Sequence, residues 1–283
     1  MISTIGILGS GTMGSGIAQV AALSGFNVLI YDVSPDALQK GLRRIKDDLH
    51  RGVEKNRLSQ QQTDAALVNI HVHSTLNPLR SADFIIEAAV EDLAIKRDLF
   101  KRLDDVLPPH SILATNTSSL SIMTIATATK RVPAVVGMHF FNPVPVMKLV
   151  EVVKGTQTSD ETVKSTCELA GKLGKVAIVC SDTPGFIVNR VARPFYGEAL
   201  RLLGEGVASV EEIDRIAKLS GGFKMGPFEL MDLIGIDVNY AVTKSIYEQY
   251  FHEPRFRPHP IQQKMVEAGT LGRKTKRGFY TYE

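Results

Sequence analysis

Short apolar runs alternate with amphipathic segments over residues 1–180 of the chain. Runs such as Ile5–Leu8, bounded by glycines, are typical of strands buried on both faces of a parallel sheet. Between them, apolar residues recur at helical spacing, as in Leu93–Val106. The predicted strands are Ile5–Leu8, Asn27–Tyr31, Ile70–His73, Asp83–Glu87, Ser111–Thr115, Val135–His139, Lys148–Val152 and Val176–Val179. This alternation predicts an α/β fold with a doubly wound, Rossmann-type sheet.

Helix-start signals place a helical hairpin between the second and third strands. Ser34 is a suitable N-cap and Pro35 suits the first turn of a helix that runs to about Val53. A second helix is predicted from Ser59, where Ser59-Gln60-Gln61-Gln62 resembles a capping box.

The pattern changes after Thr183-Pro184-Gly185, where only helical spacing continues. The predicted helices are Met13–Leu23 and Thr162–Leu173 before this point, and Phe186–Gly204, Val210–Lys218, Pro227–Tyr250 and His259–Ala268 after it. We therefore expect two domains, a sheet domain over residues 1–183 and an all-helical domain over residues 184–283.

Composition narrows the class of protein. The 283 residues carry 33 Lys and Arg against 30 Asp and Glu, and this net charge of +3 is too small to predict a nucleic-acid partner. With 44% hydrophobic and 22% charged residues the chain is of globular type, and no apolar run reaches the ~20 residues of a membrane span. No basic segment precedes the first apolar run, so no secretory signal is expected. Cys167 and Cys180 have no metal-ligand spacing and are expected as reduced thiols in a cytoplasmic protein with no metal.

A glycine fingerprint follows the first predicted strand. Gly9-Ser10-Gly11-Thr12-Met13-Gly14 is a G-x-G-x-x-G that opens a predicted helix, which is the context that makes the motif informative. Gly9 permits the tight turn, Gly11 lets the backbone approach a pyrophosphate, and Gly14 lets helix and strand pack closely. The helix N-terminus offers N–H groups to the phosphates.

Asp32 ends the second predicted strand, 18 residues after Gly14. A carboxylate at this place accepts hydrogen bonds from the ribose hydroxyls of NAD and repels the 2′-phosphate of NADP. No arginine follows directly, so the sequence predicts NAD as the cofactor.

His139 and Glu151 are the candidate proton-transfer pair. His139 ends an apolar predicted strand, at the edge of an open sheet where ligands bind. Glu151 lies within the apolar run Lys148–Val153, where an ionised carboxylate needs a partner. A carboxylate behind a histidine fixes the tautomer and stabilises the imidazolium. Spacing alone leaves a simple His–Glu ion pair equally open.

Together these motifs resemble the L-3-hydroxyacyl-CoA dehydrogenases, and the bacterial 3-hydroxybutyryl-CoA dehydrogenases are nearest in length. The resemblance covers essentially the whole chain. The motifs that carry it are Gly9–Gly14, Glu87–Asp92, Thr115–Leu120, Gly137–Glu151, Asp182–Arg190, Met225–Leu230 and Gly278–Tyr280.

The resemblance implies a role for each matching residue. His139 matches the catalytic histidine, Glu151 its paired acid, and Ser118 the serine that contacts the substrate's 3-oxygen. Asn189 matches the catalytic asparagine near the thioester. The cofactor-binding positions are Gly9, Gly11, Thr12, Met13, Gly14, Asp32, Glu91, Lys96, Asn116, Ser118, Asn142 and Lys274. Without the resemblance, Ser118 could cap a helix that begins near Ser121, and Lys96 and Lys274 would be surface charges.

Two positions depart from the family's pattern. Lys276 stands where relatives have a glycine in the loop that carries Lys274, and Lys224 stands where they often have a proline. Both changes put local loop contacts in doubt, but neither touches His139 or Glu151.

The resemblance implies an acyl-CoA substrate and a homodimer formed through the helical domain. The exposed face of the helical hairpin carries basic residues suited to the phosphates of coenzyme A, with Arg51 and Lys55 as candidate contacts. That face could equally be an ordinary solvated helix surface. The remaining basic residues are Arg43, Arg44 and Lys46.

Four alternatives stay open at this stage. One is a dicarboxylic substrate such as 3-hydroxyadipyl-CoA, and another is a related L-gulonate-type dehydrogenase. A β-hydroxyacid dehydrogenase with a catalytic lysine fits the stretch His139–Asn142 poorly. The last is a protein that binds NAD without turnover.

Overall fold

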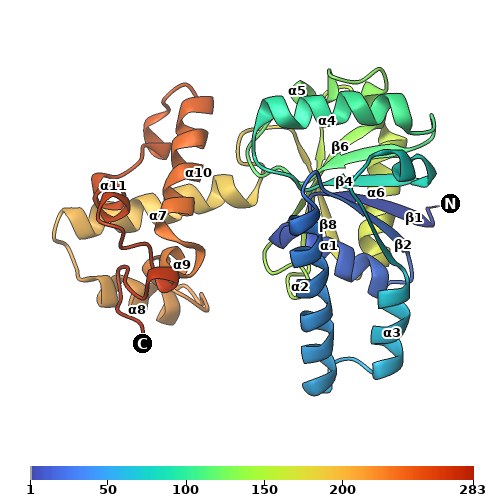
Figure 1. The fold of residues 1–283 in the computed structure, drawn as a ribbon. Coiled ribbons are helices and arrows are strands. Elements are labelled where there is room, and N and C mark those ends of the chain that lie inside the picture. Colours follow the sequence, from blue (N-terminus) through green and yellow to red (C-terminus); the bar gives the residue numbers. More distant parts are fainter. Residues whose placement is uncertain (1) are drawn as a thin grey trace. The chain divides into compact units, whose positions relative to one another are not determined.

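The computed structural model describes residues 2–283 of the chain. The chain divides into two compact units, Met1–Thr183 and Pro184–Glu283, and each is described by itself (Figure 1).

The first unit is built on one eight-stranded sheet with the order β3-β2-β1-β4-β5-β6-β7-β8. Strands β1 to β6 run parallel, β7 is antiparallel to β6, and β8 is parallel to β7. The strands are β1 (Thr4–Leu8), β2 (Asn27–Tyr31), β3 (Ile70–His73), β4 (Phe84–Glu87), β5 (Ile112–Thr115), β6 (Val135–Phe140), β7 (Leu149–Lys154) and β8 (Val176–Ser181). The predicted α/β fold with a Rossmann-type sheet is confirmed. The six parallel strands end at one edge, so the residues that follow them gather there.

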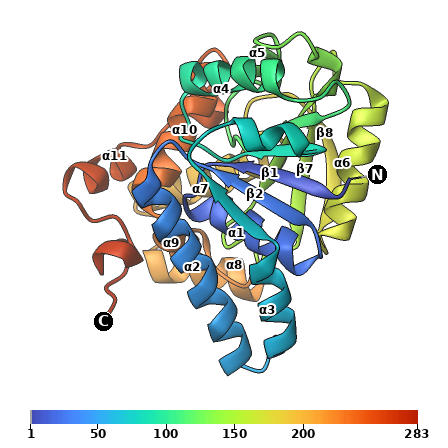
Figure 2. The same ribbon diagram turned by 45° about the vertical axis from the view of Figure 1, so that its right-hand side comes forward.

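Helices cover both faces of the sheet (Figure 2). Helices α4 and α5 pack together on one face, and α1, α2, α3 and α6 belong to the core on the other. Their bounds are α1 (Thr12–Leu23), α2 (Pro35–Glu54), α3 (Gln60–Val68), α4 (Leu93–Val106), α5 (Ile122–Ala126) and α6 (Asp160–Lys172). Short 3-10 turns are η1 (Asn77–Ser81) and η2 (Val132–Ala134).

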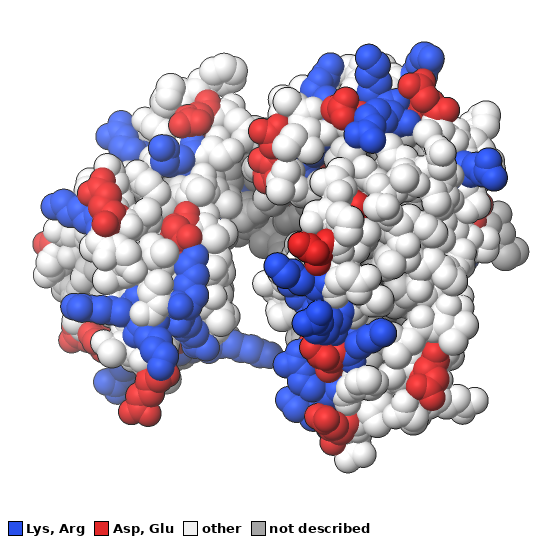
Figure 3. All heavy atoms as spheres, in the orientation of Figure 1, with Lys and Arg blue, Asp and Glu red and all other residues white. Residues whose placement is uncertain are grey.

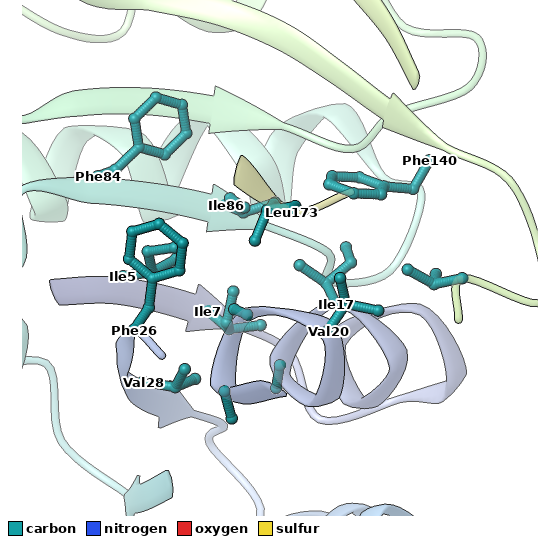
Figure 4. Packing of buried hydrophobic residues seen from close by; sticks show 14 of the residues in the cluster. Ile5, Ile7, Ile17, Val20, Phe26, Val28, Phe84, Ile86, Phe140 and Leu173 are labelled. Atoms are coloured by element: carbon teal, nitrogen blue, oxygen red, sulfur yellow. The ribbon is translucent and has the colours of Figure 1, made fainter. Parts of the chain in front are cut away.

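The core lies between the sheet and α1. Figure 4 shows Ile17 and Val20 of α1 near Ile5 and Ile7 of β1. All four side chains are at most 8% exposed. Their burial fixes α1, and with it the glycine turn that precedes α1, against the ends of the strands.

Side-chain caps start the helices where the sequence predicted. Ser34 accepts a hydrogen bond from the backbone N–H of Ala37, and Ser59 forms a complete capping box with Gln62. Ser121 caps α5, so Ser118 does not perform that task. The cap Ser159 starts α6 at Asp160, two residues before the predicted start.

The second unit is helical. Its elements are α7 (Val188–Gly204), α8 (Val210–Leu219), α9 (Pro227–Ile234), α10 (Ile236–Gln249), η3 (Pro254–Phe256), α11 (Pro260–Glu267) and η4 (Arg273–Thr275). The single helix predicted over Pro227–Tyr250 is two helices, because Gly235 has φ +102° and interrupts the chain between α9 and α10. Nowhere in residues 2–283 does a helix have the length and apolar character needed to cross a membrane.

Two buried aspartates anchor the C-terminal motif Gly278–Tyr280. Asp232 accepts hydrogen bonds from the backbone N–H groups of Phe279 and Tyr280, and Asp214 accepts one from the hydroxyl of Tyr280. Burial raises the pKa of Asp214, although its hydrogen bonds oppose the shift. A Cβ on Gly278 would lie 2.1 Å from Asp232, so close packing requires glycine there.

Candidate functional site

The glycine turn between β1 and α1 has the geometry of a phosphate-binding turn. Gly9 has φ +93°, and a Cβ on Gly14 would lie 1.8 Å from the carbonyl oxygen of Gly9. Both positions therefore require glycine. A Cβ on Gly11 would meet nothing within 4 Å, so the protein itself leaves space beside Gly11. Since Gly11 caps α1 without a side-chain hydrogen bond, the first N–H groups of α1, from Thr12 on, suit a pyrophosphate.

The fingerprint itself orients Asp32. The backbone N–H and the hydroxyl of Ser10 donate to Oδ2 of Asp32 at 2.9 and 2.8 Å, and the N–H of Ser34 donates to Oδ1 at 3.1 Å. These contacts fix the carboxylate at the end of β2, beside the glycine turn. The arrangement fits the ribose and pyrophosphate of NAD, because the acid and the open turn lie next to each other.

His139 and Glu151 are directly opposite each other on β6 and β7. Nδ1 of His139 lies 2.7 Å from Oε2 of Glu151, and their side chains are 8% and 1% exposed. The antiparallel β6–β7 pair brings together two residues that are 12 positions apart in the chain. The histidine lies at the same edge of the sheet as the glycine turn, because β1 and β6 run parallel.

Phe141 and Cys180 lie near the His139–Glu151 pair. The ring of Phe141 lies 4.6 Å from that of His139, centroid to centroid. Burial, together with the charges of Glu151 and Asp182, raises the pKa of the Cys180 thiol to about 12. Cys180 is therefore a neutral thiol at neutral pH.

Ser118 lies in a turn after β5 that Glu91 holds in place. Oε1 of Glu91 accepts hydrogen bonds from the hydroxyl of Thr117 (2.6 Å), the backbone N–H of Ser118 (2.9 Å) and the hydroxyl of Ser119 (3.2 Å). The Ser118 hydroxyl donates to the same oxygen at 3.3 Å. Burial alone would raise the pKa of Glu91, but the charge of Lys96 and these hydrogen bonds hold it below its ordinary value.

Asn116 ties this turn to the strand that carries His139. Its backbone N–H donates to the carbonyl oxygen of Glu87 at 2.7 Å. Its side-chain oxygen accepts from the N–H of Phe140 at 2.8 Å. The position of Asn116 is therefore set by both β4 and β6.

Lys96 is not the surface charge that spacing alone suggests. Its side chain is 1% exposed, and its ammonium group lies 2.6 Å from Glu87 and 3.4 Å from Glu91. Glu87, which is 0% exposed, is the partner that holds Lys96, and the sequence reasoning did not single it out. The available signal was the acid at the end of the apolar run Phe84–Glu87, the same kind of signal that singled out Glu151.

The loop between β6 and β7 carries Asn142, which is exposed. The buried ammonium group of Lys175 donates to the carbonyl oxygens of Val144 (2.5 Å) and Met147 (2.8 Å). A Cβ on Gly16 would lie 3.0 Å from Val144, so the loop packs closely on α1. These contacts hold the loop beside the glycine turn.

The remaining candidates of the second unit have partners within that unit. Asn189 lies in the first turn of α7, where its carbonyl oxygen accepts a hydrogen bond from Arg193. Lys274 forms an ion pair with Asp237, with 2.6 Å to each carboxylate oxygen. Lys276 adopts φ +57°, the left-handed conformation that glycine favours, which agrees with the glycine that the family pattern has at this position.

The basic face of α2 is only partly as predicted. Figure 3 shows Lys and Arg side chains, mixed with acidic ones, over the region of α2. Arg43, Lys46, Arg51 and Lys55 are exposed. Arg44 is half-buried, and its guanidinium donates to the hydroxyl of Ser15 at 3.3 Å. Arg51 is paired with Asp48 on the same helix.

A Rossmann-type sheet, a glycine turn with an acid on β2, and a buried His–Glu pair define the class of dinucleotide-dependent oxidoreductases. Comparison with known families gives the family. The 3-hydroxyacyl-CoA dehydrogenase NAD binding domain matches residues 4–183, and the C-terminal domain of the same family matches residues 185–282. The chain belongs to the 3-hydroxyacyl-CoA dehydrogenase family, whose members are NAD-dependent enzymes.

Individual relatives agree with this assignment. The chain is 47% identical over 281 residues to 3-hydroxyadipyl-CoA dehydrogenase of Escherichia coli, covering 99% of this chain and 59% of that protein. It is 46% identical over 282 residues to a probable 3-hydroxybutyryl-CoA dehydrogenase of Bacillus subtilis, covering 100% and 98%. The crystal structure of (S)-3-hydroxybutyryl-CoA dehydrogenase from Ralstonia eutropha matches with a TM-score of 0.96 and 44% identity, over 100% of both chains.

Proposed function

We propose that this chain catalyses the reversible oxidation of an L-3-hydroxyacyl-CoA to the 3-ketoacyl-CoA, with 3-hydroxybutyryl-CoA as its substrate. The observation that carries the proposal is the 2.7 Å contact between His139 and Glu151, at the sheet edge where the glycine turn and Asp32 lie. The names of the Bacillus subtilis and Ralstonia eutropha relatives support the four-carbon substrate.

In this proposal His139 is the general base for oxidation and the general acid for reduction. Glu151 holds Nδ1, so Nε2 takes the proton of the C3 hydroxyl, and the carboxylate stabilises the imidazolium that forms. Bound NAD supplies the hydride acceptor. Ser118 orients the 3-oxygen, and Asn189 lies near the thioester. Asp32 and the glycine turn hold the ribose and pyrophosphate.

A dicarboxylic substrate is the second candidate. The relative from Escherichia coli that is 47% identical is named 3-hydroxyadipyl-CoA dehydrogenase, so relatives at this level of identity differ in acyl group. Values of kcat/KM across four- to ten-carbon and dicarboxylic acyl-CoAs separate the two. The same panel, extended to L-gulonate, tests that alternative.

Arg51 on α2 and Lys55, directly after the end of α2, are proposed to meet the phosphates of coenzyme A, because both are exposed and basic.

The proposal also includes a cytoplasmic homodimer that is formed through the second unit. Its support is a set of exposed apolar side chains on α9 and α10: Leu233 (48% exposed), Ile234 (42%) and Val238 (47%). In this proposal the segment Pro227–Ile234 contributes to both the core of the second unit and the dimer interface, since Phe228 and Met231 on the same helix are buried in the core.

The test follows the absorbance of NADH with acetoacetyl-CoA as the second substrate. His139→Gln should lower kcat by about 100- to 10,000-fold, the range for removing a general base, while NADH still binds. Glu151→Gln should also lower kcat with the fold retained by circular dichroism. An unfolded Glu151→Gln protein would favour a structural ion pair instead.

The matched control is His110→Gln, which alters another His–carboxylate contact, 3.5 Å from Asp83, in which the histidine is 66% exposed. This variant should keep the wild-type kcat. Near-normal turnover of His139→Gln would refute the assigned mechanism.

A further inference from the structure

The carboxylate of Glu87 is buried at the end of β4 and has no part in the function proposed above. It is 0% exposed and accepts hydrogen bonds from the ammonium group of Lys96 (2.6 Å), the hydroxyl of Thr115 (2.7 Å) and the N–H of Ala89 (2.7 Å). Removing a charge from water costs several kcal/mol, which such contacts can offset. Because a buried ion pair adds little net stability compared with apolar packing, its presence here needs another reason.

Two chains of contacts lead from Glu87 to the turn that carries Ser118. In the first, the hydroxyl of Thr115 donates to Oε2 of Glu87 and accepts from the N–H of Thr117 at 3.3 Å. In the second, Lys96 joins Oε1 of Glu87 to Glu91. Glu91 then binds the N–H and hydroxyl of Ser118. Both chains end on residues 117–119.

The second chain of contacts passes through both oxygens of the Glu91 carboxylate. Lys96 contacts Oε2, and the turn binds Oε1. Oε1 has four donors: the hydroxyls of Thr117, Ser118 and Ser119 and the N–H of Ser118. The hydroxyl of Ser118, at 3.3 Å, is the farthest of the four. It is therefore the donor that a small movement of the Glu91 carboxylate releases or redirects first.

We propose that Glu87 is a positioning residue for the reaction: through Lys96, Glu91 and Thr115 it holds the turn in which the hydroxyl of Ser118 meets the substrate's 3-oxygen. Lys96 then acts by fixing Glu91. The inference rests on the function proposed above, in which Ser118 contacts that oxygen. Glu87 itself touches neither substrate nor cofactor.

The experiment compares Glu87→Gln with Asp104→Asn. The amide oxygen of glutamine can still accept from Ala89 or Thr115, so Glu87→Gln removes mainly the charge that holds Lys96. Asp104, 7% exposed, pairs with Arg131 at 2.6 Å at the other end of α4, and its loss removes a comparably buried ion pair away from the turn. For both variants kcat, the KM of NADH and of acetoacetyl-CoA, the Kd of NADH by fluorescence, and Tm are measured.

We expect Glu87→Gln to lower kcat about 10- to 100-fold, because a misplaced catalytic contact costs up to about 100-fold in rate. The Kd of NADH should rise by a smaller factor than that by which kcat falls, since Glu91 and Lys96 also match cofactor-contacting positions of the family. Asp104→Asn should lose a similar amount of Tm and keep its kcat. A folded Glu87→Gln protein with kcat within twofold of the wild type overturns the inference, and so does a loss confined to the KM of NADH.

A double-mutant cycle separates positioning from general damage. If Glu87 acts through Ser118, then adding Glu87→Gln to Ser118→Ala should lower kcat by less than about threefold further. Losses that multiply in full would overturn the inference.

Two further variants keep the test decisive. If Glu87→Gln does not fold, Thr115→Val removes one chain of contacts with little change in shape, and we expect at least a threefold lower kcat; an unchanged value overturns the inference.

His139→Gln is run in parallel. Full turnover of His139→Gln means that the proposed mechanism fails, and no turnover of acetoacetyl-CoA by the wild type means that the proposed function fails. Loss in His139→Gln with an unaffected Glu87→Gln protein means that only the inference fails.

Discussion

At the scale of single residues, the backbone conformation decides which side chain is tolerated. Gly14 leaves no room for a Cβ because the carbonyl oxygen of Gly9 would lie 1.8 Å away. Lys276 is the opposite case. Its side chain is exposed, but its φ is +57°, where any residue other than glycine is strained.

Replacing Lys276 by glycine should stabilise the protein. The relief of left-handed strain outweighs the extra chain entropy that glycine loses on folding. The net gain in the free energy of unfolding is about 0.5–1 kcal/mol. Urea unfolding measures the gain. Lys276→Ala is the control, because it removes the exposed side chain and keeps the strain, so it should show no gain. Equal effects of the two variants would contradict this explanation.

Glu91 should make stability depend on pH in the acid range. Its pKa in the folded protein is lowered from the ordinary value of 4.5, so folding favours the ionised form. That stabilisation is complete above the unfolded-state pKa and is lost as the pH falls through the lowered folded-state pKa. The free energy of unfolding of Glu91→Gln should therefore lie below that of the wild type at neutral pH, and the gap should close as the pH falls below the unfolded-state pKa and through the lowered folded-state pKa.

Glu168→Gln, on the exposed side of α6, serves as the control for Glu91→Gln and should leave the acid slope unchanged. A gap between Glu91→Gln and the wild type that stays constant with pH would show that the hydrogen bonds of Glu91 do not depend on its charge.

At the scale of elements, α2 has two separate tasks. Leu38, Ile45 and Leu49 on one side are buried in the core. The other side carries exposed basic residues, which are accessible to a ligand, although Arg51 is already paired with Asp48.

Charge reversal at Arg51 or Lys55 should weaken the binding of coenzyme A substrates. We expect the KM of acetoacetyl-CoA to rise about threefold to tenfold at low salt, and less at high salt, while the KM of NADH is unchanged. Arg102→Glu on α4 is the matched control, since Arg102 is 48% exposed on a different helix. An equal rise of both KM values for Arg51→Glu would contradict the placement of coenzyme A.

At the scale of the whole molecule, the second unit leaves apolar side chains in contact with solvent. Leu233 and Val238 are 48% and 47% exposed, on helices whose other faces are packed in the core. Exposed apolar side chains grouped on two consecutive helices are a common feature of protein–protein interfaces.

The 283-residue chain should therefore sediment as a dimer, at about twice its mass of 31.0 kDa. Leu233→Glu combined with Val238→Glu should shift it to the monomer mass, because two charges cannot be buried unpaired in an apolar interface. Val68→Glu, which changes an apolar residue of α3 that is 74% exposed, is the control and should leave the mass unchanged. A dimer that survives the double substitution would place the interface elsewhere.

Local signals determined most of the fold and part of the site. The strands were predicted to within one or two residues, because most of them are short apolar runs buried on both faces. Strand β8 is equally apolar, although most of its side chains are exposed. The caps Ser34 and Ser59 mark helix starts by their own chemistry. The glycine turn and Asp32 could also be predicted from the sequence. The turn depends on neighbouring residues in the chain, and Asp32 lies directly at the end of a predicted strand. Gly235 was missed because it interrupts an apolar helical pattern whose spacing continues on both sides.

Only the tertiary structure decided which distant groups touch. The strand register places His139 opposite Glu151, and the ends of β4 and β5 with α4 bring Glu87, Lys96 and Glu91 together. Spacing alone suggested a surface lysine at position 96, the resemblance to the family suggested a cofactor contact there, and neither gave a role to Glu87. The physical reason is that burial and pairing depend on what packs against a residue. Periodicity indicates only which helix or strand a residue belongs to. A charged side chain forms a buried ion pair only when another element places an opposite charge within hydrogen-bond distance.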